Sequence, residues 1–299
     1  QSSILKGISS SAAEFDLNIS AFISYSGALI NPRHDMGECS IFSLPDFNDF
    51  DGAILLTNTV GYQSVVTDIL NRIKEAGIPA VSIDNDIPYL YYIGIDNKHA
   101  MRCITEHLIE RHGFSRFAYI SGPDDNPESS ARLSGFLEVL REHNITISDD
   151  YIYHGDFRAP SGRAAAESFL ANPNGLPQAV ICANDVMAAA VINRFGDEGL
   201  SVPDDIAVTG FDNTYSNHNY QVELTSVGRP LSLSGRLACK MLYNHFNGIA
   251  QERSVVLNMS AIFTESCGCR ENILSDIYEF KKLNYRNYMR FENSQTYSN

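Results

Sequence analysis

The stretch QAVICANDVMAAAVINRFGDEG, residues 178–199, decides the fold of this chain. Its first six residues are mostly apolar, and this length is typical of a buried β-strand. Asn184 and Asp185 interrupt the run, and small apolar residues then return at helical spacing as far as Gly199. Glycine is a common residue at the C-terminus of a helix. The stretch therefore predicts a strand followed directly by a helix.

The same order of strand and helix recurs along the chain. Short β-like runs lie at residues 18–24, 52–56, 79–83, 116–121, 151–155, 178–183 and 205–211. Apolar residues at helical spacing predict helices at residues 64–77, 100–113, 132–144, 185–199 and 231–248. Alternating strands and helices predict an α/β fold whose parallel sheets are covered on both faces.

Two segments depart from this order. Residues 26–50 are rich in Pro, Gly, Asn and Asp where a covering helix is expected, which predicts an irregular or β-hairpin connection. Residues 271–299 carry apolar and aromatic side chains at helical spacing. This last segment is expected to be either a connector helix leading to a further domain or a tail helix packed on its own domain.

The composition is that of a soluble globular protein of about two domains. The 299 residues include 22 basic and 36 acidic side chains, which gives a formal net charge of −14. This charge repels phosphate backbones, and no run of Lys and Arg offsets it, so direct contact with nucleic acid is not expected. No apolar window has the roughly 20 residues that a bilayer span needs, so no membrane partner is expected. The chain starts with Gln inside a helical pattern, which indicates a piece of a longer protein.

The six cysteines give a weak signal for a metal. Four stand singly in apolar or mixed segments, as buried thiols do: Cys39, Cys103, Cys182 and Cys239. Cys267 and Cys269 form a lone C-x-C, and a structural zinc site needs about four ligands. A reduced pair is favoured, while a metal site and a disulfide stay open. His107 and His112 lie on or beside one predicted helix, where a solvated surface is expected, and no metal or cofactor is assigned.

Polar side chains follow several of the predicted strands. Asp84 follows residues 79–83, Asn184 and Asp185 follow residues 178–183, and Asp212 follows residues 205–211. In open α/β sheets, ligands bind beyond the carboxyl ends of the strands. Asn and Asp are also favoured helix N-caps, and capping is the better interpretation of any one of them alone. Asp185 stands directly before the helix and is assigned to the cap, while Asn184 is assigned to a ligand.

The sequence carries none of the common catalytic signatures. It has no Gly-rich phosphate loop of the Walker or G-x-G-x-x-G kind, no G-x-S-x-G and no H-E-x-x-H. The ligand-like polar groups therefore predict binding rather than turnover, and the chain is not expected to be an enzyme.

Seven motifs in order resemble the effector-binding region of the lactose-repressor family of regulators, itself similar to periplasmic sugar-binding proteins. Between residues 51 and 230 they are DGAILL, IPAVSID, GFSRFAYISGP, ARLSGF, CANDVMAAAVI, VPDDIAVTGFDNT and LTSVGRP. Weaker matches extend from Ile4 to about Cys269. Any one motif is weak, but seven in the family's order are specific.

The resemblance implies two Rossmann-like lobes of the type I periplasmic-binding-protein-like fold, joined by three crossover strands, with the ligand in the cleft. The N-terminal lobe is expected to comprise residues 1–94 and 229–257, and the C-terminal lobe residues 95–228 and 258–270, followed by a connector helix at 271–299. The first strand of the family fold has no match and is expected upstream of Gln1.

The resemblance also assigns ligand-binding roles by motif. Arg132 of ARLSGF resembles the arginine that clamps polar groups of the ligand. Asn184 and Asp212 resemble the amide and acid that bind hydroxyls or ring nitrogens, and Phe157 occupies the position of the stacking aromatic. Asp84 is a weaker match from the N-terminal lobe.

Together these features predict the ligand-sensing domain of a bacterial transcription or signalling regulator that binds a small polar effector, foremost a sugar. The resemblance further implies a homodimer, a cytoplasmic location and an output domain outside this chain, either DNA-binding or a diguanylate cyclase. No helix-turn-helix motif precedes the core, so this segment is not expected to bind DNA. The alternative is a free-standing periplasmic or lipoprotein sugar-binding protein of a transporter.

Overall fold

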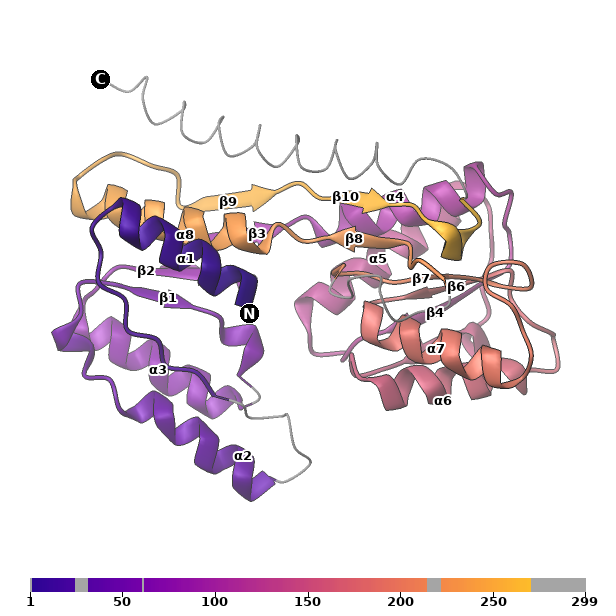
Figure 1. The fold of residues 1–299 in the computed structure, drawn as a ribbon, viewed down its shortest axis with the longest axis horizontal. Helices are drawn as coiled ribbons and strands as arrows, with labels where there is room; N and C mark the ends of the chain where they lie inside the picture. The colour runs from indigo at the N-terminus through magenta and orange to yellow at the C-terminus, as the bar shows by residue number, and fades with distance from the viewer. Residues whose placement is uncertain (1, 25–31, 61, 214–221, 270–299) are drawn as a thin grey trace. The chain divides into compact units, whose positions relative to one another are not determined.

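The computed structural model of the 299-residue chain describes residues 2–24, 32–60, 62–213 and 222–269. The chain forms two compact units, shown in Figure 1. The first contains Gln1–Ile95 and Pro230–Leu257, and the second contains Asp96–Arg229 and the described residues from Asn258 onward. The backbone therefore passes between the units three times. The predicted helix at 271–299 lies outside the described residues.

The first unit is built on a parallel sheet of four strands in the order β1-β2-β3-β9. These strands are β1 (Ala53–Leu55), β2 (Ala80–Ile83), β3 (Tyr91–Ile95) and β9 (Ser254–Leu257). Helix α1 (Ser2–Glu14) lies along α8 (Leu231–Phe246), which packs on β2 and β3. Figure 1 shows α3 (Gln63–Ala76) on the other side of β1 and β2 from α8. Both faces of this sheet are thus covered by helices, as the alternating pattern predicts.

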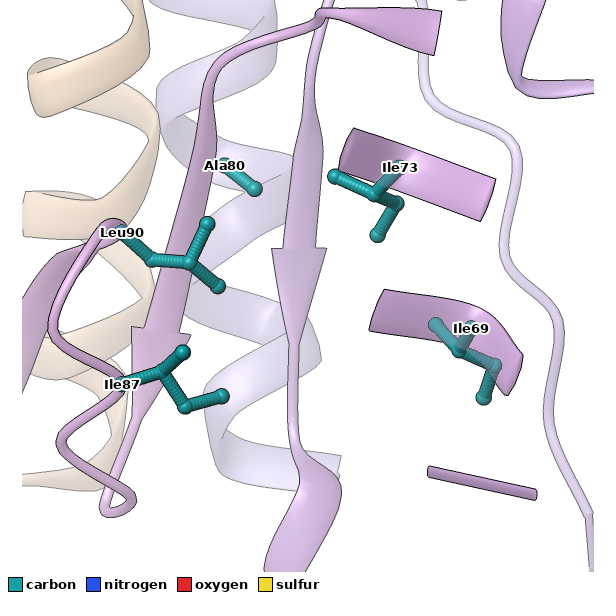
Figure 2. Close-up of a cluster of buried hydrophobic side chains, with 5 residues drawn as sticks. All are labelled: Ile69, Ile73, Ala80, Ile87 and Leu90. Carbon is teal, nitrogen blue, oxygen red and sulfur yellow. The ribbon is translucent and has the colours of Figure 1, made fainter. Parts of the chain in front are cut away.

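A small apolar cluster between α3 and the sheet fixes the position of that helix (Figure 2). Ile69 and Ile73 lie one turn apart on α3 and belong to the same buried cluster as Ala80 at the start of β2. Ile87 and Leu90, from the connection between β2 and β3, complete the cluster. The helix ends at Gly77, whose φ of 68° is the left-handed conformation that glycine adopts without strain.

Two sequence-based predictions about the first unit are wrong. Residues 18–24 form no strand, and Ile19 and Ile23 of that run are 48% and 38% exposed. A strand needs a neighbour for its backbone N–H and C=O groups, and no ladder partner for this run exists among the described residues. Local alternation alone could not supply that partner.

The predicted irregular or hairpin connection at 26–50 forms no hairpin among its described residues; it is a series of short helical elements with irregular residues at 44–46 and 50. It contains α2 (Pro32–Cys39) and the short 3₁₀ turns η1 (Ser40–Ser43) and η2 (Phe47–Asp49), and η3 (Thr57–Thr59) follows β1. Arg72 of α3 donates hydrogen bonds to the carbonyl oxygens of Phe42, at 2.8 Å, and Pro45. A side chain that is distant in the sequence therefore satisfies two backbone carbonyl groups of this segment. The local sequence does not reveal this contact.

The second unit is built on a second parallel sheet, in the order β5-β4-β6-β7. Its strands are β4 (Phe117–Ser121), β5 (Ile152–His154), β6 (Ala179–Cys182) and β7 (Ala207–Thr209), with a turn η4 (Asp149–Tyr151) before β5. Every residue of β4, β6 and β7 is buried. A short antiparallel ribbon pairs β8 (Ser226–Gly228) with β10 (Ser260–Ile262), and the turn η5 (Glu265–Cys267) follows.

Two helix pairs cover the second sheet, and glycines let the helices of each pair approach closely. The pairs are α4 (Asn97–Glu110) with α5 (Pro127–Glu142), and α6 (Ala159–Leu170) with α7 (Asp185–Asp197). A Cβ at Gly135 of α5 or at Gly162 of α6 would lie 2.5 Å from a backbone oxygen of the partner helix. The predicted α/β class with parallel sheets is confirmed.

None of the helices among the described residues is long and apolar enough to cross a membrane.

Candidate functional site

The predicted ligand-binding residues of the second unit gather where its parallel strands end. Arg132 of α5 is the centre of the group and is only 1% exposed. Its Nε donates to Asn97 Oδ1 at 2.8 Å, and its Nη1 donates to the carbonyl oxygen of Ala183 at 2.6 Å. Its Nη2 donates to Asp212 Oδ1 at 3.3 Å. One guanidinium thus joins the start of α4 to the residues that follow β6 and β7.

Arg132 belongs to a network of alternating charges. Asp212 Oδ1 also accepts a hydrogen bond from Arg229 Nη1 at 3.4 Å, and Arg229 Nη2 donates to Glu128 Oε1 at 3.3 Å. Glu128 Oε2 lies 4.0 Å from Arg132 Nη2. Two cations and two carboxylates compensate each other, which a buried guanidinium requires because desolvation of an unpaired charge is costly.

Two aromatic rings flank the arginine. The guanidinium carbon of Arg132 lies 3.8 Å from the ring centroid of Phe211 and 5.8 Å from that of Phe157. Phe157 packs over Gly122, where a Cβ would lie 2.2 Å from the ring. Phe211 is buried, whereas Phe157 is half-buried. Phe157 and the Asp212 carboxylate, 19% exposed, therefore form the solvent-facing part of the group.

The assignment of the helix cap to Asp185 is wrong, because Asn184 is the N-cap of α7. Asn184 Oδ1 accepts a hydrogen bond from the Met187 N–H at 2.9 Å, and its Nδ2 donates to the Phe157 carbonyl oxygen at 2.9 Å. Asp185 is 1% exposed and accepts a hydrogen bond from Ser226 Oγ at 2.6 Å. The extended backbone of Asn184 is the conformation that a capping residue adopts, so geometry decides between two neighbours that propensity cannot separate.

Backbone strain is concentrated at these strand ends. Phe157, Asp212 and Asn213 have φ values of 66°, 95° and 44°, in the left-handed region that non-glycine residues rarely adopt. The Asn213 N–H donates to Ser226 Oγ at 3.1 Å, and Asp212 is bridged to Gly228 of β8. Such conformations persist only where surrounding contacts hold them, and they are common at binding sites.

Asp84, the fifth predicted residue, lies in the first unit directly after β2. Its φ is 65°, and its backbone N–H donates to the Ile93 carbonyl oxygen at 2.8 Å. Asn58 Nδ2 donates to the Asp84 carbonyl oxygen at 3.0 Å. The second unit brings Arg132, Phe157, Asn184 and Asp212 together, whereas Asp84 belongs to the corresponding strand end of the first unit.

Sequence reasoning missed four residues of the group: Asn97, Glu128, Phe211 and Arg229. Phe211 lies beside Asp212 in the motif GFDN, and Arg229 lies in the motif SVGRP. The motifs could therefore have found these two. Asn97 and Glu128 sit in the first turns of α4 and α5, where polar residues are ordinary, and only the tertiary contacts identify them.

The residue types in the group suit the binding of a polar ligand. A fork of donors, a carboxylate and an aromatic ring suit hydroxyl groups and the apolar face of a ring.

Comparison with known proteins places this geometry in a family. A family model described as "Periplasmic binding protein-like domain" matches residues 105–267. Catabolite control protein A of Priestia megaterium is 31% identical over 231 residues, which cover 72% of this chain and 68% of that protein. The chain belongs to the periplasmic-binding-protein-like family. Its relatives place it among the regulators of the lactose-repressor type, as the motifs predict.

Further relatives and solved structures agree with this membership. The PurR repressor of Pasteurella multocida is 33% identical over 152 residues, which cover 51% of this chain and 45% of that protein. The regulator CelR in complex with cellobiose superposes with a TM-score of 0.73 at 26% identity, over 89% of this chain and 78% of that chain. The lac repressor dimer bound to operator and the anti-inducer ONPF has a TM-score of 0.71 at 22% identity, over 89% and 88% of the two chains.

The comparisons concern the fold of the chain and the functional class of its relatives. The lac repressor match supports the fold alone, and the named relatives are transcriptional regulators rather than enzymes. This periplasmic-binding-protein-like chain spans about half the length of the PurR relatives it matches.

Proposed function

We propose that the chain is the ligand-sensing domain of a bacterial regulator and that its effector is a sugar. The observation that carries the proposal is the Arg132–Asp212 pair beside the ring of Phe157, at the carboxyl ends of the second unit's strands. In open α/β sheets this is where ligands bind. Asp84, at the equivalent strand end of the first unit, stays a predicted contributor.

The roles of the residues follow from their exposure. Arg132 is buried and orients the Asp212 carboxylate, whose second oxygen can accept hydrogen bonds from two neighbouring hydroxyls. Phe157 offers the face of its ring to the apolar face of a pyranose. Asn184 holds the Phe157 backbone and retains one amide N–H for the ligand. Contacts already made within the protein fix the donors and acceptors before binding, which reduces the entropy lost on association.

The relatives support this class of function. Named relatives are transcriptional repressors, and the CelR structure is titled as a complex with cellobiose, a sugar. An output domain outside the chain, a homodimer and a cytoplasmic location complete the proposal and rest on the same relatives. Effector binding is proposed to favour one of two conformations and so to alter the output.

Thermal unfolding in the presence of candidate effectors tests the proposal. The panel comprises cellobiose, other mono- and disaccharides, nucleosides and amino acids. A sugar at 100 times its dissociation constant is expected to add about 2.7 kcal/mol of stability. Asp212→Asn should remove most of that gain, because an amide cannot accept as two carboxylate oxygens do. Asp197→Asn, at the exposed C-terminal end of α7, is the matched control and should respond like the wild type.

Two outcomes would count against the proposal. If a stabilising ligand stabilises Asp212→Asn and Phe157→Leu as much as the wild type, the ligand binds elsewhere. If nucleosides or amino acids stabilise the wild type and no sugar does, the sugar assignment is wrong and the site has another effector class.

A further inference from the structure

Two histidines and two cysteines meet in the second unit, away from the residues around Arg132. His107 lies in the last turn of α4 and His112 just beyond it, while Cys267 and Cys269 follow β10. The Nε2 atoms of the histidines and the Sγ atoms of the cysteines all lie within 4.8 Å of one another. None of the six cysteines, all within the described ranges, forms a disulfide. The expectation of a solvated surface for the two histidines is wrong, because both are partly buried in this cluster.

The separations match those of ligands around one small cation. The two Nε2 atoms are 3.1 Å apart, and Cys269 Sγ lies 3.3 Å from His107 Nε2 and 3.5 Å from His112 Nε2. Cys267 Sγ lies 3.7 Å from His107 Nε2. In a tetrahedral zinc site, bond lengths of about 2.0 Å to nitrogen and about 2.3 Å to sulfur place the ligands about 3.3 Å apart for two nitrogens and about 3.5 Å apart for nitrogen and sulfur.

We infer that His107, His112, Cys267 and Cys269 form a structural zinc site. Two imidazoles and two thiolates are a common zinc ligand set, and four protein ligands leave no open position for a catalytic water. Binding exchanges each S–H bond for a zinc–sulfur bond and releases two protons to the solvent, so no oxidant is required.

The surroundings hold the four ligands in place. The ring of His107 stacks on Phe263 with centroids 3.6 Å apart, and the ring of His112 stacks on Phe114 at 5.4 Å. Gly268, between the two cysteines, has a φ of 101°, and a Cβ there would lie 3.3 Å from the His112 ring. The glycine lets both cysteines turn toward the same point beside that ring.

The metal would join two parts of the unit that are far apart in sequence. His107 and Cys267 are separated by 160 residues. One side of the site is the end of α4, and the other is η5 with the two residues that follow it. A zinc ion would therefore tie the C-terminal end of the described chain to the end of α4.

Metal content and stability test the inference in the purified chain. Wild type is expected to hold about one zinc per chain by elemental mass spectrometry, and chelation should lower its Tm, which added Zn²⁺ restores. Cys269→Ser and His112→Gln should hold little zinc and show no Tm response to it. Cys103→Ser and His99→Gln are the matched controls, because this Cys–His pair lies 3.6 Å apart on the same helix but outside the cluster. They should retain the zinc.

Cobalt substitution keeps the test decisive if the cluster variants do not fold. Co²⁺ added to the chelated wild type should give the intense visible absorption of a tetrahedral site and the near-ultraviolet band of thiolate-bound cobalt. Wild type that binds neither zinc nor cobalt in this way, with thiols that react freely or form a disulfide, would overturn the inference. Cluster variants that retain zinc as well as the controls do would overturn it too.

Discussion

Single side chains hold the strand ends of the second unit in place, and Arg132 is the clearest case. It is almost fully buried and binds three groups from different parts of the chain: the Asn97 amide, the Ala183 carbonyl and the Asp212 carboxylate. These hydrogen bonds, with the Asp212 carboxylate as counter-charge, reduce the cost of burying the guanidinium.

Asn184 provides a prediction at this scale. Asn184→Ala removes the cap of α7 and the donor to Phe157, so the free energy of unfolding should fall by about 1–2 kcal/mol in urea denaturation. Asn184→Asp keeps the capping oxygen, so its free energy of unfolding should fall by less. Asn193→Ala, exposed on the same helix, should change stability by no more than about 0.5 kcal/mol. Equal losses in Asn184→Ala and Asn193→Ala would show that the cap contributes little.

At the scale of elements, glycines decide how closely the helices pack. Helices α1 and α8 of the first unit approach through Gly7 and Gly235. A Cβ at Gly7 would lie 2.0 Å from the Ser232 carbonyl oxygen, and one at Gly235 would lie 2.2 Å from the Ile4 carbonyl oxygen. Backbone atoms cannot yield as the end of a side chain can. These two positions therefore set the spacing of the helix pair.

Two substitutions of the same kind should have opposite effects. Gly235→Ala should destabilise the protein by about 1–3 kcal/mol, because the helices must move apart, although alanine is the better helix former. Gly196→Ala in α7 meets nothing within 4 Å and should stabilise it by up to about 1 kcal/mol. Chemical denaturation of both variants measures the difference. A neutral or stabilising Gly235→Ala would mean that α1 and α8 shift at little cost.

At the scale of the whole molecule, the two units differ in their surfaces. Among the described residues, the large apolar side chains that are exposed all belong to the first unit. They are Ile19, Ile23, Met36, Leu44, Tyr89, Phe246, Ile249 and Val256. Val256 lies on β9, an edge strand of the first sheet. We propose that part of this exposed apolar surface is an interface.

The proposed homodimer should therefore form through the first unit. Light scattering at micromolar concentration should give about twice the chain mass of 33.1 kDa. Hydrogen exchange should be slower in the first unit at high protein concentration than after dilution, while the second unit changes little. A mass of one chain at all concentrations would contradict the proposed dimer. Concentration-dependent protection confined to the second unit would show that the interface lies there instead.

The sequence by itself determined the alternation of strands and helices, the parallel α/β class and the motifs that identify the family. These depend on local periodicity and on short segments such as CANDVMAAAVI, so they can be read without knowing the neighbours. The positions of Arg132, Asn184 and Asp212 beyond strands or in motifs could be predicted in the same way. Their contribution to ligand binding remains a prediction.

Only the tertiary structure decided which groups meet. Residues 18–24 have the pattern of a strand but join no sheet in the part of the chain that the structure describes, and the turns before β1 depend on Arg72 from α3. Asn184 rather than Asp185 became the cap because its backbone is extended at the junction. His107 and Cys267 are brought together across 160 residues. The deciding contact in most of these cases joins segments that are far apart in the sequence, and at Asn184 the deciding feature is a backbone angle. A local pattern of residues encodes neither.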